Sequence, residues 1–264
     1  MYKYITILFL LIFQSEINTS FAQLNTEKKY QMGIIIGAGL NNIKTISKIA
    51  NPNNPGNDLT IGMNIVRSYN QNIAFNSGIE FDFSSIGYKY DEKIFYDYTD
   101  NQILSKKEKT NVKNITQFNL KERNQSPIYI SIPTMLVFKT EYIGYNRFFS
   151  KFGMRHSFIL KDLVSDSDIN GNNDITMETN KELSIYTGSV GISVGTEWNY
   201  LSNSTIMFEL GYYYGITNLN RNNALFGDID KNKTLYTIDI NNNLNYQTIK
   251  STRDQIALKI SFLF

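Results

Sequence analysis

Eight segments of this 264-residue chain alternate apolar and polar residues, and this repetition constrains the fold more than any other feature. Successive side chains of a β-strand point to opposite faces, so sustained alternation predicts a strand with one apolar face. The final segment, RDQIALKISFLF, has a polar face of Gln255, Ala257, Lys259 and Ser261 and an apolar face of Ile256, Leu258, Ile260, Phe262 and Phe264. Something apolar must therefore cover one side of this strand up to its last residue.

The other seven segments have the same period. They span residues 31–41, 59–69, 73–83, 128–138, 148–160, 185–198 and 205–217. Their lengths are close to the ~9–11 residues that a tilted strand needs to cross a bilayer, and the smallest closed membrane barrels have about eight strands. Pro133 interrupts the fourth segment, and because proline has no N–H for the ladder, we expect a bulge or a local break there.

The connections between these segments alternate in length. Those at residues 70–72, 139–147 and 199–204 are short, whereas those at 41–58, 84–127, 161–184 and 218–252 are long. This alternation is typical of an up-and-down barrel with both termini at the end of the short turns. We therefore expect an all-β fold, namely a closed eight-stranded antiparallel up-and-down transmembrane β-barrel formed by residues 23–264, with its long loops extracellular.

The N-terminus predicts export from the cytoplasm. Lys3 precedes an apolar run at residues 5–13, and Ser20 and Ala22 occupy the small-residue positions of a cleavage site. The run is shorter than the roughly 20 residues of a membrane-spanning helix, so we interpret residues 1–22 as a cleaved signal peptide rather than an uncleaved anchor. The absence of cysteine excludes disulfides and thiol chemistry, and a net charge of only +2 argues against nucleic acid as a partner.

Alternation alone allows the apolar face to point outward into lipid or inward, as in a soluble lipocalin-like barrel. The polar face favours lipid outside, because it combines small residues with charges of both signs that would pair as an interior plug. The predicted lumen charges are Glu80, Asp82, Lys151, Arg155, Glu197, Glu209 and Lys259. Aromatic residues near the segment ends resemble the two interfacial girdles of membrane barrels. They are Phe148, Trp198 and Phe264 at the short-turn end and Phe158, Tyr186 and Tyr214 at the long-loop end.

With these segments in place, the chain resembles the PorT-like outer-membrane β-barrel family of Bacteroidetes. The resemblance is carried by GIIIGAGL, YISIPTMLVFK, SVGISVGTEW, FELGYYYGITNL and ALKISFLF, and it extends from Met32 to Phe264. It implies an eight-stranded barrel in the outer membrane of a Gram-negative bacterium, and some members of the family resemble accessory parts of secretion and gliding machinery. No catalytic motif transfers. The terminal Phe264 also resembles the signal that the β-barrel insertion machinery reads in outer-membrane barrels.

The sharpest local motif is DSDINGNND, at residues 166–174. Its candidate calcium ligands are Asp166, Asp168, Asn170 and Asp174. Oxygen ligands at alternate positions and the turn residue Gly171 match the start of a calcium loop, but Met177 stands where a bidentate acid is expected. The competing interpretation is a polar hairpin tip with an Asn-Gly turn. A second Asp-x-Asp-x-Asn at residues 228–232 adds some support for calcium.

An enzyme finds little support in the sequence. The single histidine, His156, falls on the lipid-facing side of its segment. Glu80 and Asp82 fall on the lumen side, where we expect them to pair with Lys151, Arg155 or Lys259. The tyrosines of the connection 84–127 predict an extended hairpin above the membrane, offering a surface to a protein or glycan partner, whereas its Lys-rich half is equally consistent with a mobile solvated loop.

The expected function is therefore that of a non-enzymatic outer-membrane scaffold or interaction protein without a cofactor. We expect it to be embedded in outer-membrane lipid, to contact other envelope proteins through its long loops, and to serve as an accessory to secretion or gliding-type machinery. A small channel, a soluble ligand-binding barrel and an enzyme at the barrel rim are the alternatives.

Overall fold

The computed structural model of the chain describes residues 28–47, 49–53, 55–99, 102–168, 174–178, 182–201, 204–220, 233–247 and 249–264. The predicted signal peptide and the motif at residues 228–232 lie outside these ranges. Among the described residues, no helix is long and apolar enough to cross a membrane. The helical structure described is one 3-10 turn, Glu108–Asn111.

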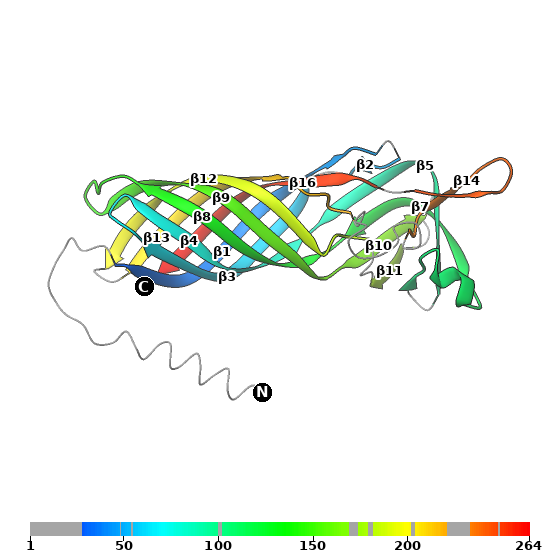
Figure 1. Cartoon of the computed structure of the whole chain (residues 1–264), viewed down its shortest axis with the longest axis horizontal. Coiled ribbons are helices and arrows are strands. Elements are labelled where there is room, and N and C mark those ends of the chain that lie inside the picture. Colours follow the sequence, from blue (N-terminus) through cyan, green and yellow to red (C-terminus); the bar gives the residue numbers. More distant parts are fainter. Residues whose placement is uncertain are drawn as a thin grey trace, which may run out of the picture.

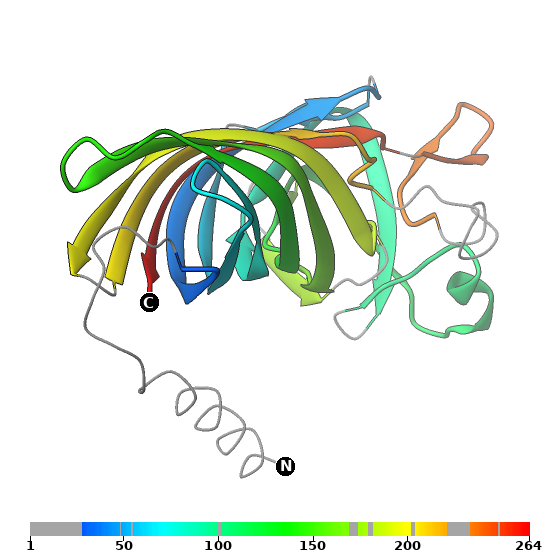
Figure 2. The same ribbon diagram turned by 60° about the vertical axis from the view of Figure 1, so that its left-hand side comes forward.

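Eight long strands close into an antiparallel barrel, which confirms the fold class expected from the alternation. The strands are β1 (Tyr30–Thr45), β3 (Gly56–Ser68), β4 (Ile73–Ser84), β8 (Ile128–Lys139), β9 (Asn146–Lys161), β12 (Tyr186–Leu201), β13 (Ser204–Gly215) and β16 (Ser251–Leu263). Each strand pairs with its predecessor and successor among these eight, and β16 pairs with β1 to close the ring. Figures 1 and 2 show the C-terminus at one end of the barrel and the remaining strands beyond the other end.

The strand registers place apolar residues of one strand beside apolar residues of the next, all around the barrel. Ile36 of β1 lies opposite Ile260 of β16 on one side and Ile61 of β3 on the other, and all three belong to apolar parities. Because a slip of one residue would turn every side chain to the other face, the alternation fixes this register. The outward parity is mainly apolar, and the lumen parity carries the charged residues together with small apolar clusters such as Val66, Val137 and Phe149.

Several barrel strands are longer than the sequence predicted. β1 continues to Thr45 and β3 begins at Gly56, so the first long connection occupies residues 46–55 rather than 41–58. At Pro133 a local break is present and a bulge is absent: pairing between β4 and β8 is interrupted between Ser77–Thr134 and Glu80–Ser131, yet the register is the same on both sides. The missing N–H of Pro133 thus removes ladder bonds without shifting the strands.

The long connections build a second set of strands beyond one end of the barrel, which we call the cap. It comprises β2 (Asn51–Pro52), β5 (Ile86–Thr99), β6 (Gln102–Ile103), β7 (Thr116–Gln125), β10 (Leu163–Asp168), β11 (Asp174–Glu178), β14 (Tyr236–Ile238) and β15 (Leu244–Tyr246). β5 and β7 form the extended hairpin expected from the tyrosines, and they continue the barrel pair β4–β8 after a break of one or two residues.

The cap has a hydrophobic core of its own. Ile86, Tyr88, Ile94 and Tyr96 of β5 are at most 1% exposed and pack with Phe118, Leu120, Val164, Leu183, Leu219 and Leu235 from the other connections. Burial of this many apolar side chains stabilises a defined structure, since each contributes roughly 1.5–3 kcal/mol. The cap is therefore a packed extension of the barrel in the described residues, not a set of separate loops.

Candidate functional site

The charged side chains of the barrel lumen form the site with the densest polar chemistry. All seven predicted members, Glu80, Asp82, Lys151, Arg155, Glu197, Glu209 and Lys259, are at most 4% exposed. They reach the lumen from β4, β9, β12, β13 and β16 because each occupies the polar parity of its strand. Buried charges are tolerated only when they are paired and hydrogen-bonded, so the pairing determines what this lumen can do.

Glu80 lies at the centre of the largest cluster. Lys259 Nζ donates to both of its carboxylate oxygens at 2.9 Å, and Arg155 Nη2 donates at 2.6 Å. Arg155 also donates to Asp82 Oδ1 at 2.6 Å, and Thr60 donates a further hydrogen bond to that carboxylate at 2.7 Å. Two carboxylates and two cations thus neutralise one another within a single hydrogen-bonded group.

Three further ion pairs lie towards the short-turn end. Of the three cations expected as partners of Glu80 and Asp82, Arg155 and Lys259 are found there, whereas Lys151 Nζ donates to Glu209 at 2.6 Å. Glu197 accepts from Arg147 Nε and lies 3.2 Å from Lys139 Nζ. The lumen is therefore cross-linked by ion pairs along most of its length.

Four charged lumen residues were missed by sequence reasoning. They are Asp58, Lys139, Arg147 and Arg253. Each stands at or near a strand end, where the alternation had been read as a connection or not counted. Extending the parity of the confirmed strands by two residues at each end would have identified them.

Aromatic side chains fill the lumen between these ion pairs. Tyr213 is 3% exposed, and the guanidinium of Arg155 lies 5.3 Å from the centre of its ring. The ring covers Gly191, where an added Cβ would lie 2.5 Å from Tyr213 Cδ1, so only glycine leaves room for the tyrosine. A barrel of eight strands has a lumen that side chains can fill, and here ion-paired side chains and aromatic rings occupy most of it.

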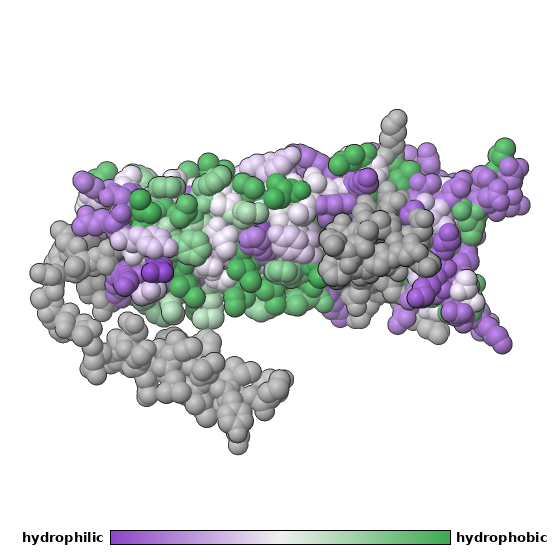
Figure 3. All heavy atoms as spheres, in the orientation of Figure 1, coloured by the Kyte–Doolittle hydropathy of each residue, from purple (hydrophilic) through white to green (hydrophobic). Residues whose placement is uncertain are grey.

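The outward face is apolar over the barrel strands. Figure 3 shows this apolar surface in green between polar surfaces at the short-turn end and over the cap. Exposed apolar residues of the barrel include Met32, Ile34, Ile36, Leu40, Leu59, Ile61, Met63, Ile65, Ile79, Phe81, Phe83, Leu136, Phe138, Phe152, Leu160, Ile192, Val194, Phe208, Leu210, Tyr212, Ile256, Leu258 and Phe262. Soluble monomers rarely expose contiguous apolar surface above a few hundred Å².

The residues predicted as girdles all lie on this outward face. Phe148, Trp198 and Phe264 are exposed near the short turns, and Phe158, Tyr186 and Tyr214 are exposed near the cap. The backbone of Phe264 exchanges two hydrogen bonds with that of Met32, with N···O distances of 2.8 and 3.3 Å. The last residue of the chain is therefore part of the seam that closes the barrel.

The predicted calcium ligands are placed in the β10–β11 hairpin, whose tip lies outside the described residues together with Asn170. Asp166 is 0% exposed, and both of its carboxylate oxygens accept from Arg123, at 2.7 and 2.6 Å. Arg123 also pairs with Glu182. Asp168 and Asp174 belong to strands rather than to a binding loop. Among the described residues, no group of three or more acidic or histidine side chains is arranged to hold a metal.

A second buried carboxylate of the cap, Asp162, lacks such a cation partner in the described contacts. It is 1% exposed, receives a long hydrogen bond of 3.5 Å from Gln125 Nε2, and leaves its Oδ1 atom without a partner. Burial, with a smaller contribution from the nearby Glu182, raises the pKa of Asp162 to about 8. The cap therefore contains a carboxyl group that holds a proton at neutral pH.

His156 lies on the outward face, as its parity predicted. Its Nδ1 is 2.9 Å from the hydroxyl of Tyr186, and its ring stacks on that tyrosine with the centroids 6.0 Å apart. Thr134 Oγ1 is 3.4 Å from its Nε2. In the described contacts the histidine is hydrogen-bonded to hydroxyl groups and not to a carboxylate, so the arrangement lacks the oriented base of a catalytic triad.

These observations define the class: an eight-stranded up-and-down β-barrel with an apolar exterior, a charged and filled interior, and a β-rich cap. No protein-family model matches the chain, and no curated protein matches it in sequence. Similar solved structures include Ail, the attachment invasion locus protein of Yersinia pestis, at 14% identity and a TM-score of 0.32 over 90% of this chain and 100% of Ail. Neisserial surface protein A is similar at 8% identity and a TM-score of 0.30, covering 88% and 96%. The outer membrane protease OmpT from Escherichia coli is similar at 10% identity and a TM-score of 0.39, covering 94% and 99%. At this level no activity transfers, and the class rests on the strand pairing of this chain.

Proposed function

We propose that the protein is a non-enzymatic scaffold of the Gram-negative outer membrane, in which the barrel anchors the cap at the cell surface. The observation that carries this proposal is the belt of outward apolar side chains around a charged lumen. A soluble ligand-binding barrel needs the opposite arrangement, because its exterior faces water and its interior receives an apolar ligand. Lipid is the solvent that fits the exterior described above.

The role of an interaction scaffold is supported by the cap. Its packed core holds a defined surface in place, and the β14–β15 hairpin projects from it (Figure 1). At this hairpin Ile240 is 100% exposed, with Ile238 and Leu244 each more than a third exposed. We assign the exposed apolar side chains of this hairpin to contact with another envelope protein. The resemblance to PorT-like barrels further suggests an accessory role in secretion or gliding-type machinery.

Phe264 supports the membrane part of the proposal from the other end of the molecule. Phe264 is exposed on the outward face and paired with β1, which suits an interfacial anchor, and we propose that it also acts as a signal for the insertion machinery. Its deletion should slow assembly into the outer membrane more than it lowers the stability of the assembled barrel.

Fractionation of cells that express the full chain tests the location. We expect the protein in the detergent-extracted outer-membrane fraction, with the mobility of a folded barrel on unheated gels and with protease cleavage confined to the cap in intact cells. Recovery from the soluble periplasm without detergent would overturn the proposal.

Photo-crosslinking in intact cells tests the interaction role. A crosslinking amino acid at Ile240 should capture a discrete envelope protein, whereas the same group at Tyr142, exposed at the opposite end, should not. Equal capture at both sites would contradict a cap-specific partner.

Single-channel recording in planar bilayers distinguishes the proposed scaffold from a small channel. A filled lumen predicts no conductance steps.

A further inference from the structure

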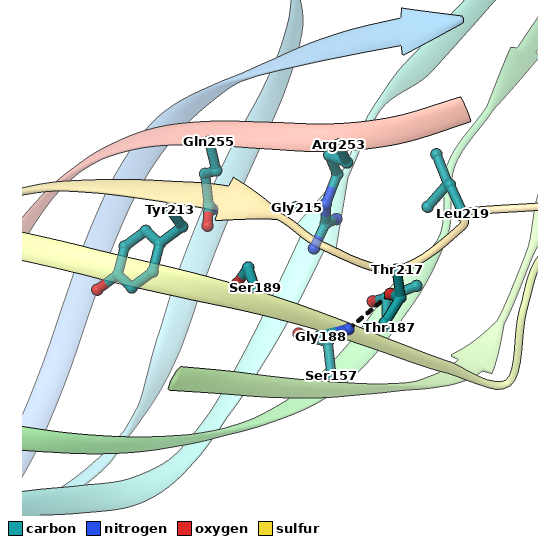
Figure 4. A pocket seen from close by; sticks show the side chains of 10 residues that line it. All are labelled: Ser157, Thr187, Gly188, Ser189, Tyr213, Gly215, Thr217, Leu219, Arg253 and Gln255. Carbon is teal, nitrogen blue, oxygen red and sulfur yellow. Dashed lines mark hydrogen bonds between the residues drawn. The ribbon is translucent and has the colours of Figure 1, made fainter. Parts of the chain in front are cut away.

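A polar recess lies inside the barrel near the cap, beside the ion-paired part of the lumen. The space that the centre of a water-sized sphere can occupy in it is about 20 Å³, and the recess opens to solvent. Residues of four strands line it, including Ser157 of β9, Thr187 and Ser189 of β12, Tyr213 of β13 and Arg253 of β16. Figure 4 shows the guanidinium of Arg253 extending from its strand into the space that Ser189 also faces.

The lumen carries one more positive charge than it has negative charges. The cations turned into it by the eight described strands are Lys139, Arg147, Lys151, Arg155, Arg253 and Lys259, and the carboxylates are Asp58, Glu80, Asp82, Glu197 and Glu209. Asp254 does not change this count, because it lies on the outward parity, 2.5 Å from Lys44 Nζ. Six cations and five carboxylates leave one surplus positive charge. Arg147 and Lys139 share Glu197, and Arg253 reaches Asp58 through the hydroxyl of Ser84 rather than by direct contact.

Arg253 is the lumen cation that lacks direct contact with a carboxylate in the described ion pairs. Its Nη1 donates to Ser84 Oγ at 3.1 Å, and its guanidinium lies 4.6 Å from the ring centre of Tyr129. Ser84 in turn donates to Asp58 at 2.5 Å, so Asp58 is reached only through a hydroxyl. A guanidinium has five N–H groups in a planar fork, and this one retains donors that face the recess.

The hydroxyl groups around the recess complete a set of donors. The side chains of Thr187 and Ser189 take part in none of the hydrogen bonds recorded between described residues, and both line the space with Arg253. Ser157 Oγ is 2.7 Å from Ser131 Oγ, and Ser131 donates to Asp82, so Ser157 is linked to the central cluster from one side only. A guanidinium together with hydroxyl groups is a typical arrangement for recognising carboxylate or phosphate oxygens.

We propose that this recess is a binding site for a small oxyanion, with Arg253 as its anchor and Thr187 and Ser189 as hydroxyl donors. The ligand is a carboxylate or phosphate group, free or at the end of a larger solute, and it gives Arg253 the direct contact with an anion that the described ion pairs do not provide. The recess suits a group of this size because the strands around it bear small side chains. This site goes beyond the scaffold role, and it requires the barrel interior but neither the partner of the cap nor a particular membrane.

Titration of the purified full chain in detergent tests the site. Sodium phosphate and sodium acetate are added at constant ionic strength set by sodium chloride, with glucose as a neutral solute, and binding is followed by calorimetry and by the thermal midpoint. We expect saturable binding of at least one of the two oxyanions. If neither binds, or if glucose binds equally well, the proposal is wrong.

Two substitutions and two control variants locate the binding. Arg253→Gln removes the anchor and should weaken binding at least tenfold. Ser189→Asp places a carboxylate in the same recess and should have a similar effect while leaving Arg253 intact, whereas Ser189→Asn is its neutral control and should bind nearly as the unmodified chain does. Lys44→Gln, a cation on the outside of the barrel, should leave binding unchanged. Unaltered binding in Ser189→Asp, or a loss in Lys44→Gln equal to that in Arg253→Gln, would overturn the assignment.

Discussion

Replacing Glu80 by glutamine should leave a buried cation without a counter-charge. The side chains of Glu80, Arg155 and Lys259 are 4%, 1% and 2% exposed, so solvent screens their interactions little. Arg155 keeps Asp82 at 2.6 Å after the substitution, and the loss therefore falls on Lys259. Removing one partner of a buried ion pair costs about 3–5 kcal/mol, because the remaining charge is uncompensated, and the partner retained by Arg155 places Glu80→Gln near the lower value.

Urea unfolding from lipid vesicles measures this cost. Trp198, the single tryptophan, lies on the outward face and is 39% exposed, so its fluorescence reports the loss of the barrel from lipid. We expect Glu80→Gln to lower the free energy of unfolding by about 3 kcal/mol. The double variant Glu80→Gln/Lys259→Met removes the unpaired charge as well, and it should be more stable than Glu80→Gln alone.

The double-mutant cycle decides whether the reasoning holds. Residues in one ion-pair network show interaction energies of about 0.5–3 kcal/mol, whereas independent residues add. A cost of Glu80→Gln below about 1 kcal/mol, or strict additivity with Lys259→Met, would refute the view that these pairs carry the stability of the lumen. Glu141→Gln, at an exposed carboxylate of a short turn, is the matched control and should have little effect.

Three further predictions concern the outer face and the cap. Leu258→Arg, in the middle of the outward face, should destabilise the barrel in vesicles by about 2–4 kcal/mol, whereas Leu160→Arg at a strand end should cost about 0–1, and equal losses would contradict a lipid-facing exterior. The pKa of Asp162 is about 8 in the folded protein against an ordinary value of 3.8, so the folded state binds the proton more tightly. Stability should therefore fall as pH rises between these two values, by up to about 1.4 kcal/mol per pH unit, and then level off. Hydrogen exchange of the cap measures this slope, which should be absent in Asp162→Asn. Arg123→Gln leaves the buried Asp166 unpaired and should speed proteolysis of the cap while the barrel keeps its folded mobility on gels, and unchanged cap resistance would argue against this ion pair as a stabilising element.

The barrel could be predicted from sequence because its information is local and repeated. The residue pattern of each strand shows which side is apolar. In the last strand Ile256 and Leu258 lie on the apolar side and Ala257 and Lys259 on the other, and the eight patterns are compatible with one closed sheet. The same parity placed seven charges in the lumen. It did not determine which cation meets which carboxylate, because that depends on the stagger between strands, and Lys151 consequently pairs with Glu209 rather than with Glu80.

The cap could not be predicted to the same extent, since its pairings join distant segments. Asp166 is a predicted calcium ligand because its immediate neighbours are acidic and polar, whereas Arg123, with which it pairs in the structure, lies 43 residues earlier in the chain. Likewise Tyr236 of β14 pairs with Phe95 of β5, a contact that no local pattern encodes. Alternation within one strand cannot indicate which of several remote strands lies beside it.

The continuity between the barrel hairpin β4–β8 and the cap hairpin β5–β7 has a mechanical consequence. Ser84 donates its backbone N–H to Pro127 at 3.0 Å, and Ile86 is already paired with Gln125, so the ladder crosses the junction almost without a gap. A force applied to the cap is then distributed over several backbone hydrogen bonds loaded in shear, whereas a flexible linker would extend under the same force. We therefore expect the cap to be rigidly attached to the barrel, so that its tilt relative to the bilayer follows the tilt of the strands that hold it.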